Sequence, residues 1–476
     1  MKKPSRTIAA VALCLGAGLA QAAEFKPCDD AASDPALNGS LCAIEQVPGD
    51  PSGLAGGPAA PVSLFVRKFP AQGSAQGGSR GQVWLVAGGP GESGASFYGM
   101  LPTFRRAFPG FDLLMPDHRG TGFSTRMCPA EEAVGSPGGT ALDGAEWGAC
   151  FQYLNQHPAY ARQFSQTNAA HDLKLLIERT PRHGKTWLFG VSYGTQLVLR
   201  TVAMGAAVDG LVLDSLVPLQ DDATADLSRR SLVTDAVGRE LLAGCDRGRC
   251  GQVIGEPLEP LYRRLLARAA TEPALLASVP GKDLKRLFGT LLDFPGAASR
   301  IPEIIKELDA GQDTQLKAAL ADVQRKAATL GNFPQLPAST PLVILISGSE
   351  NDLRPGRTLD EVKREEAGLL FSSGIPGHLV GSPIPLYERD AWFARLPERL
   401  PPTLVLQGSR DAKTPHGAAV RHIEALRKAG PVQLFTDFGG GHWVLWADSP
   451  CHADEVMQFV LGEEALARCV SIKLSH

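Results

Sequence analysis

A serine stands between two glycines in the segment Gly190-Val191-Ser192-Tyr193-Gly194. An apolar run typical of a strand precedes it, and a helix-like run follows it. In such a strand-to-helix turn the serine hydroxyl projects from the backbone, and glycines two residues to either side avoid a steric clash. The pattern therefore predicts that Ser192 is a nucleophile, with the N–H group of Tyr193 placed to stabilise negative charge on a reacting carbonyl oxygen.

A nucleophilic serine needs a base, and histidine is the side chain that most often supplies one. Of the ten histidines, His442 stands in a glycine segment directly after the strand-like run 432–436. His157, His183 and His416 are instead expected on the surface. His442 is therefore the predicted general base.

The base in turn needs a carboxylate that orients it. Asp411 follows the strand-like run 403–407, which directly precedes the run that leads to His442. Asp352 is the alternative acid, since it also follows a strand-like run, 341–346. Both residues fit the order serine, acid, histidine that is typical of an α/β-hydrolase scaffold. Asp411 is preferred because its strand directly precedes the one that leads to His442, whereas Asp352 would lie inside the insertion.

A second oxyanion donor is expected on the loop after an earlier strand. The segment Gly88-Gly89-Pro90-Gly91 follows the strand-like run 83–87, and its missing side chains let backbone amides approach a carbonyl oxygen. The N–H groups of Gly89 and Tyr193 are thus the predicted oxyanion hole. A plain tight turn explains the same glycines and proline equally well.

The elements that must position these residues can be read from the order of apolar runs. In the first half of the chain, strand-like runs alternate with helical patterns, which favours a mostly parallel sheet covered on both faces. Helical patterns then take over, apart from the isolated run 341–346, before the strand pattern resumes. The expected parts are an irregular segment 23–60, a sheet core 61–215, a large helical lid insertion 216–400, and the rest of the core 401–476.

Together these motifs resemble the α/β-hydrolase family of serine exopeptidases that contains the proline iminopeptidases and the secreted tripeptidyl aminopeptidases. The resemblance covers about residues 60–215 and 400–470, and it implies the roles already given to Ser192, His442 and Asp411. The matching segments are Gly88 to Gly91, Asp117 to Ser124, Gly190 to Gly194, Gly408 to Pro415, Gly441-His442, and Ser449-Pro450-Cys451 with the later Cys469.

In that family, acidic lid residues bind the free amino terminus of the substrate. The resemblance therefore points to Glu350 and Asp352, which follow the run 341–346, although a solvated acidic loop fits them at least as well. The sequence shows no clear aromatic-and-glutamate lid signature of the proline iminopeptidases. Strict proline specificity is therefore not expected.

The amino terminus, residues 1–22, has the features of a secretory signal. Lys2, Lys3 and Arg6 precede an apolar run, and small residues up to Ala22 fit a cleavage site. A lipoprotein signal acylated at Cys14 is a weaker interpretation. No later apolar stretch is long enough to cross a bilayer, so the mature protein is expected in the periplasm or outside the cell.

Export to an oxidising compartment favours disulfides. Eight cysteines remain after removal of the signal, and although eight allow about 105 pairings, short loops are the easiest to close. A metal site at Cys245 and Cys250 is a weaker alternative, because no second ligand pair or histidine cluster accompanies it. The expected bridges are Cys28–Cys42, Cys128–Cys150, Cys245–Cys250 and Cys451–Cys469.

The leading hypothesis is an exported serine aminopeptidase that cleaves peptides through an acyl-enzyme, without a metal or cofactor. A carboxylesterase or another acyl hydrolase is the close alternative, because both reactions pass through a tetrahedral oxyanion. A non-catalytic binding protein of the same fold is a remote alternative. The formal net charge of −3, without long runs of one sign, argues against nucleic acid as a partner.

Overall fold

The computed structural model describes residues 23–462, except residues 58, 73–77, 134–135, 137–146 and 448. The predicted signal 1–22 and Cys469 lie outside the described residues. Within this part of the chain, no helix has the length and apolar composition needed to cross a membrane.

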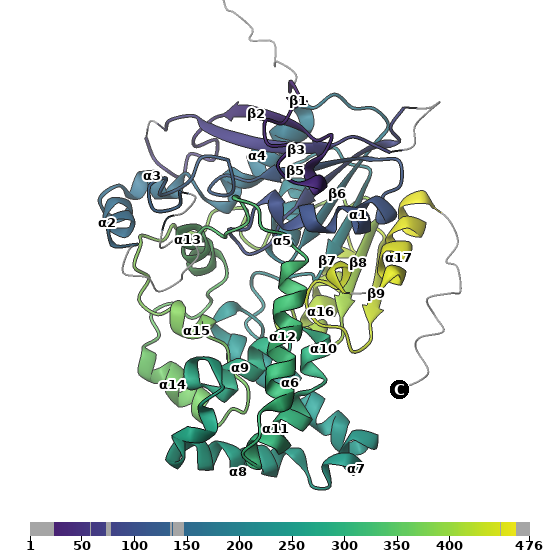
Figure 1. Ribbon diagram of the computed structural model, residues 1–476. Helices are drawn as coiled ribbons and strands as arrows, with labels where there is room; N and C mark the ends of the chain where they lie inside the picture. Colours follow the sequence, from purple (N-terminus) through teal and green to yellow (C-terminus); the bar gives the residue numbers. More distant parts are fainter. Residues whose placement is uncertain are drawn as a thin grey trace, which may run out of the picture.

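A nine-stranded sheet runs through the molecule in the order β1-β2-β3-β5-β4-β6-β7-β8-β9 (Figure 1). The strands from β5 to β9 pair in parallel, whereas β1, β2, β3 and β5 pair antiparallel at the other end of the sheet. The sheet is therefore mostly parallel in the region that the motifs occupy, as predicted. The strands are β1 (Lys26–Pro27), β2 (Leu41–Val47), β3 (Val62–Phe69), β4 (Gly81–Val86), β5 (Asp112–Asp117), β6 (Lys185–Val191), β7 (Gly210–Asp214), β8 (Thr403–Gly408) and β9 (Val432–Asp437).

Helices cover both faces of the sheet, and successive side chains of each strand enter opposite cores. In β6, Leu188 packs with α4, α5 and α16, whereas Trp187 and Phe189 pack with α1 and α17 on the other face. Such strands must be apolar along their whole length, which is why they appear in the sequence as continuous hydrophobic runs. These helices are α1 (Leu101–Ala107), α4 (Gln166–Arg179), α5 (Tyr193–Ala203), α16 (His416–Leu426) and α17 (Pro450–Leu461).

The chain between β7 and β8 forms the helical insertion, which has a hydrophobic core of its own. Tyr262, Phe288 and Phe371 pack together in this core, and Figure 1 shows α6, α8, α11 and α12 gathered beside the sheet. The helices of the insertion are α6 (Arg230–Arg247), α7 (Arg249–Ile254), α8 (Leu258–Thr271), α9 (Leu284–Leu291), α10 (Pro295–Ala298), α11 (Ile301–Asp309), α12 (Thr314–Ala328), α13 (Thr340–Glu350), α14 (Leu359–Ala367) and α15 (Ile375–His378).

Two sequence expectations about this architecture were wrong. The run 341–346 is the buried start of helix α13, not a strand. A short apolar run does not distinguish a strand from a buried helix, and Pro341 fits the first turn of a helix. The segment 23–60 is not wholly irregular either, because β2 pairs along its full length with β3 and extends the sheet.

Three of the four expected disulfides are present: Cys28–Cys42, Cys128–Cys150 and Cys245–Cys250. The third bridge excludes the alternative metal site at that pair. The fourth pair includes Cys469, so it stays a prediction. Among the described residues, one group of three potential metal ligands lies close together, but it includes both cysteines of the first bridge.

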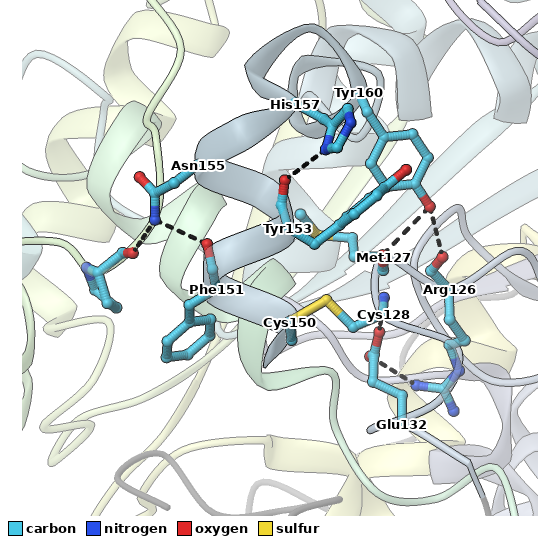
Figure 2. Close-up of a disulfide and its surroundings, with 11 residues drawn as sticks. Arg126, Met127, Cys128, Glu132, Cys150, Phe151, Tyr153, Asn155, His157 and Tyr160 are labelled. Atoms are coloured by element: carbon cyan, nitrogen blue, oxygen red, sulfur yellow. Dashed lines mark hydrogen bonds and ion pairs between the residues drawn. A yellow bond between two sulfur atoms is a disulfide. The ribbon is translucent and has the colours of Figure 1, made fainter. Parts of the chain in front are cut away.

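The bridge Cys128–Cys150 ties the segment after β5 to α2 (Gly148–Gln156), as Figure 2 shows. Beside it, Cys128 N donates to Glu132 Oε2 at 2.8 Å, and Tyr160 Oη of α3 (Pro158–Arg162) donates to Arg126 O at 3.1 Å. Asn155 Nδ2 donates to Pro383 O at 2.8 Å. These contacts connect the sheet core to the last part of the insertion.

Candidate active site

Ser192 lies in a tight turn between β6 and α5. Its backbone has φ 53° and ψ −126°, a conformation that a residue other than glycine rarely adopts. A Cβ on Gly190 would lie 2.6 Å from Gly194 O, and a Cβ on Gly194 would lie 2.3 Å from Val86 O. Glycine is therefore required at both positions, and the turn has the geometry that the sequence motif predicted.

The loop after β4 lies directly beside Ser192. A Cβ on Gly88 would be 3.2 Å from Ser192 Cβ, and Gly89 has φ 104°, which favours glycine. Tyr193 is the first residue of α5, so its N–H group has no acceptor within the helix. The structure thus brings the loop that carries Gly89 and the first residue of α5 close to the same serine.

Asp411 and His442 are in direct contact at the ends of β8 and β9. His442 Nδ1 lies 2.8 Å from Asp411 Oδ2, and the carboxyl group is completely buried. Thr414 Oγ1 donates to the same oxygen at 2.6 Å, and Thr414 N donates to Oδ1 at 2.8 Å. Burial alone would raise the pKa of Asp411, but the charge and hydrogen bonds of His442 and Thr414 lower it to about 2. The carboxylate therefore stays ionised beside the imidazole.

A second buried carboxyl group, Asp214 at the end of β7, holds the loop that follows His442. Its Oδ1 accepts from Val444 N and its Oδ2 from Leu445 N, both at 2.8 Å. Ser215 Oγ accepts from Trp443 N at 2.7 Å. Burial raises the pKa of Asp214 to about 6, against the effect of these amide bonds. Asp214 was not among the residues predicted from the sequence, although it follows the apolar run 211–213 at the end of a strand, as the other site residues do.

Ser192 and His442 both line a cavity of about 580 Å³, together with Gly89 and with residues of the insertion. Within the described part of the chain, Ser192 Oγ forms no hydrogen bond to the imidazole. Catalytic hydrogen bonds are often long in ligand-free enzymes and shorten when substrate is bound. The sheet supplies the serine and histidine of this cavity, and the insertion supplies most of its opposite wall.

Charged side chains surround the serine in this cavity. Glu92 directly follows the glycine loop. A Cβ on Gly88 would lie 3.3 Å from Glu92 Oε2 and 3.2 Å from Ser192 Cβ, so both side chains lie close to Gly88. Burial raises the pKa of Glu92, while the charges of Lys413 and His442 act to lower it. Lys413 forms an ion pair with Asp293 at 3.0 Å. Glu92 was not predicted from the sequence, although its position next to the predicted oxyanion loop could have indicated it.

The predicted amine anchors Glu350 and Asp352 lie elsewhere. Glu350 is the last residue of α13, completely buried, and forms an ion pair with Arg200 at 2.8 Å. It also accepts from Tyr387 Oη and from Gln220 Nε2, both at 2.9 Å. These contacts are those of a structural ion pair, and Asp352 accepts from the N–H of Arg354 at 2.8 Å. A role of either carboxylate in amine binding stays a prediction.

Comparison with known proteins gives a clear result for the fold. A family model described as the alpha/beta hydrolase fold matches residues 83–449, which include β5 to β9, the insertion and the three predicted triad residues. The match confirms the fold class expected from the sequence. No curated protein matches the sequence.

Solved structures with several different activities are similar to this chain. A proline iminopeptidase-related protein from Thermus thermophilus has 16% identity over 88% of this chain and 96% of that chain, with a TM-score of 0.37. An esterase from a Rhodococcus species has 15% identity over 84% and 95%, with a TM-score of 0.35. Epoxide hydrolase A from Mycobacterium thermoresistibile has 17% identity over 89% and 100%, with a TM-score of 0.35. These similarities do not distinguish between the three activities.

Proposed function

Because the chain belongs to the alpha/beta hydrolase fold family, we propose that it is a serine hydrolase with Ser192 as nucleophile, His442 as base and Asp411 as orienting acid. Ser192 Oγ attacks the substrate carbonyl carbon while His442 Nε2 takes the hydroxyl proton. The N–H groups of Gly89 and Tyr193 donate to the oxyanion. His442 then protonates the leaving group, and water hydrolyses the acyl-enzyme by the same route. Asp411 holds the proton on Nδ1, so Nε2 is free to act as the base.

Among such hydrolases, we propose an aminopeptidase, and Glu92 is the observation that carries this choice. An aminopeptidase must hold a free ammonium group close to the scissile carbonyl, and a carboxylate is the complementary group. Glu92 lines the cavity of Ser192 and stands next to the oxyanion loop. Burial raises the pKa of Glu92, so a bound ammonium would stabilise its charged form. Glu92 is better placed for this role than Glu350 or Asp352.

A carboxylesterase is the second candidate, favoured by an apolar extension of the site. A cavity of about 500 Å³ shares His442 with the cavity of Ser192 and is lined by Phe294, Trp443 and Trp446, among others. Because His442 protonates the leaving group, an apolar alcohol could occupy this cavity. The same cavity also accepts an apolar residue of a peptide leaving group.

The three disulfides indicate an oxidising compartment. Together with the signal-like residues 1–22, they support export to the periplasm or the medium. The substrate is then a peptide or small acyl compound of that compartment.

The test is hydrolysis of a substrate panel by the mature protein and by Ser192→Ala. The panel contains chromogenic mono-, di- and tripeptide amides with a free amine, the same compounds with a blocked amine, and short acyl esters. Cleavage that requires the free amine and is lost in Ser192→Ala is the expected result, and it also gives the number of residues released. Activity on esters alone would establish the carboxylesterase instead. Substantial activity of Ser192→Ala would exclude Ser192 as the nucleophile.

Glu92→Gln tests the amine anchor in the same panel. We expect a 10- to 100-fold rise in KM for free-amine substrates, corresponding to about 1.4 to 2.7 kcal/mol, and little change for esters. The matched control is Glu388→Gln, an exposed glutamate of the insertion. An equal loss on blocked and free amines would show that Glu92 acts on the reaction in general rather than on the amine.

A further inference from the structure

Arg230, the first residue of α6, has no ionic partner among the residues that the structure describes. The arginines next to it along the chain are paired: Arg229 with Asp226, and Arg239 with Asp235. Two other cations line the cavity of Ser192: Lys413 is paired with Asp293 at 3.0 Å, and Arg286 lies 4.0 Å from Asp283. Among the described residues that line the cavity of Ser192, Arg230 is thus a cationic group without an ion pair.

This guanidinium lies at the catalytic centre. Arg230 lines the cavity of about 580 Å³ that contains Ser192 and His442. It also lines a smaller cavity of about 60 Å³ on the side of Ser192 that contains Tyr193. Arg230 is therefore at the junction of the two spaces that a substrate attached to Ser192 can occupy.

The nearby carboxylates do not satisfy Arg230. Burial lowers the pKa of Arg230, and Asp293 and Asp411 are the carboxylates whose charges oppose that effect. Asp293 is already paired with Lys413, and Asp411 with His442. A partly buried guanidinium without a partner is unfavourable, and groups of this kind concentrate at binding sites.

Glu92, the carboxylate proposed to bind the amine, lines the same cavity as Arg230. The charges that act on Glu92 are those of Lys413 and His442, whereas those that act on Arg230 are Asp293 and Asp411. Glu92 and Arg230 are thus a negative and a positive side chain that both line the cavity of Ser192. A ligand that carries an ammonium and a carboxylate complements both.

We propose that Arg230 binds a carboxylate of the substrate, so that the enzyme prefers short peptides that carry a negative charge in addition to the free amine. The inference rests on the proposed serine hydrolase function. Guanidinium and carboxylate form two parallel hydrogen bonds, which fixes the orientation of the bound group as well as its position. The carboxylate has two possible sources, an acidic side chain or the carboxyl terminus of a short peptide.

Two arms of one experiment distinguish these sources in the wild type. The first compares free-amine p-nitroanilides with Asp or Glu against the same compounds with Asn or Gln, none of which has a terminal carboxylate. The second compares neutral tripeptides with a free carboxyl terminus against their carboxyl-terminal amides. We expect at least a 10-fold higher kcat/KM for the carboxylate member in one arm.

The same arms are repeated with Arg230→Gln and Arg230→Lys. Arg230→Gln should abolish the preference, and Arg230→Lys should keep part of it, since lysine preserves the charge but not the paired hydrogen bonds. Arg247→Gln, an exposed arginine at the other end of α6, is the matched control and should keep the full preference. Labelling of Ser192 by an uncharged fluorophosphonate shows whether each variant retains an intact site.

A binding measurement gives a second readout that does not depend on turnover. Calorimetric titration of the preferred peptide into Ser192→Ala and into Ser192→Ala with Arg230→Gln should show a Kd at least 10-fold higher for the double variant. No preference in either arm, or a preference that survives Arg230→Gln, would overturn the inference while Ser192→Ala still lacks activity. Activity that persists in Ser192→Ala would overturn the proposed function itself.

Discussion

Two neighbouring strands, β7 and β8, each place a buried carboxyl group against the segment that carries His442. The two carboxyl groups make different contacts with that segment. Asp411, after β8, contacts the imidazole ring at 2.8 Å. Asp214, at the end of β7, contacts the backbone N–H groups of Val444 and Leu445. Both side chains are completely buried. One carboxyl group therefore acts on the ring, and the other acts on the loop.

The surroundings move the pKa values of the two groups in opposite directions. For Asp411 the effect of burial is overcome by His442 and by the bonds from Thr414, and the pKa falls to about 2. For Asp214 burial prevails over two amide bonds, the bond from Ser215 and the charge of His442, and the pKa rises to about 6. Direct contact with His442 makes the difference, because Asp411 is hydrogen-bonded to the imidazole whereas Asp214 is not. Only Asp411 is suited to stabilise an imidazolium during catalysis.

Replacement of Asp411 should break the function with the largest effect. Asp411→Asn keeps the shape of the side chain but removes its charge and can present an N–H to Nδ1, which favours the wrong tautomer. We expect kcat to fall about 10⁴-fold, with the fold retained. Steady-state kinetics above pH 7 and circular dichroism check this result. A loss smaller than that of Asp214→Asn would mean that the two roles are assigned the wrong way round.

Replacement of Asp214 should have a smaller effect, of a different kind. Asp214→Asn keeps one acceptor oxygen for two backbone N–H groups, so the loop that follows His442 should shift. A displacement of about 1 Å at a catalytic group can cost about 10²-fold in rate, so we expect a 10- to 100-fold fall in kcat. The melting temperature should fall as well, because one buried N–H group loses its acceptor. Unchanged kcat and melting temperature would exclude the positioning role.

The sequence predicted the residues that end clear strands. Ser192, Asp411 and His442 each follow an apolar run, and parallel strands bring such positions to one edge of the sheet. Asp214 ends an equally clear run, but it acts on the backbone of a loop that is distant in sequence. A contact of that kind leaves no pattern of residue types in a single sequence.

The insertion was less predictable than the sheet for a physical reason. Its apolar run 341–346 forms a helix because its partners lie on the sheet and in the insertion, which local sequence does not specify. The pairing of Glu350 with Arg200, and the lack of a partner for Arg230 among the described residues, likewise depend on tertiary packing. Local sequence therefore predicts the position of the chemistry well and the charges that meet the substrate poorly.

The smallest expected effect is a difference in how pH changes the stability of the two variants. The depressed pKa of Asp411 contributes stability above its unfolded value of about 3.9, and this contribution is lost as pH falls through about 2. The raised pKa of Asp214 contributes stability below about 3.9, and that contribution is lost as pH rises through about 6. The gap in melting temperature between wild type and Asp411→Asn should therefore narrow as pH falls from 5 to 3.

The gap in melting temperature between wild type and Asp214→Asn should instead narrow as pH rises from 4 to 7. Thermal unfolding of the three proteins across pH 3 to 8 measures both slopes, and we expect changes of a few degrees. The wild type in each buffer is the reference, which cancels the titration of all other groups that the variants share. If the two gaps in melting temperature change with pH in the same direction, the two carboxyl groups do not differ in their electrostatic surroundings. Opposite slopes would separate the carboxylate that must stay charged beside His442 from the one that holds its loop.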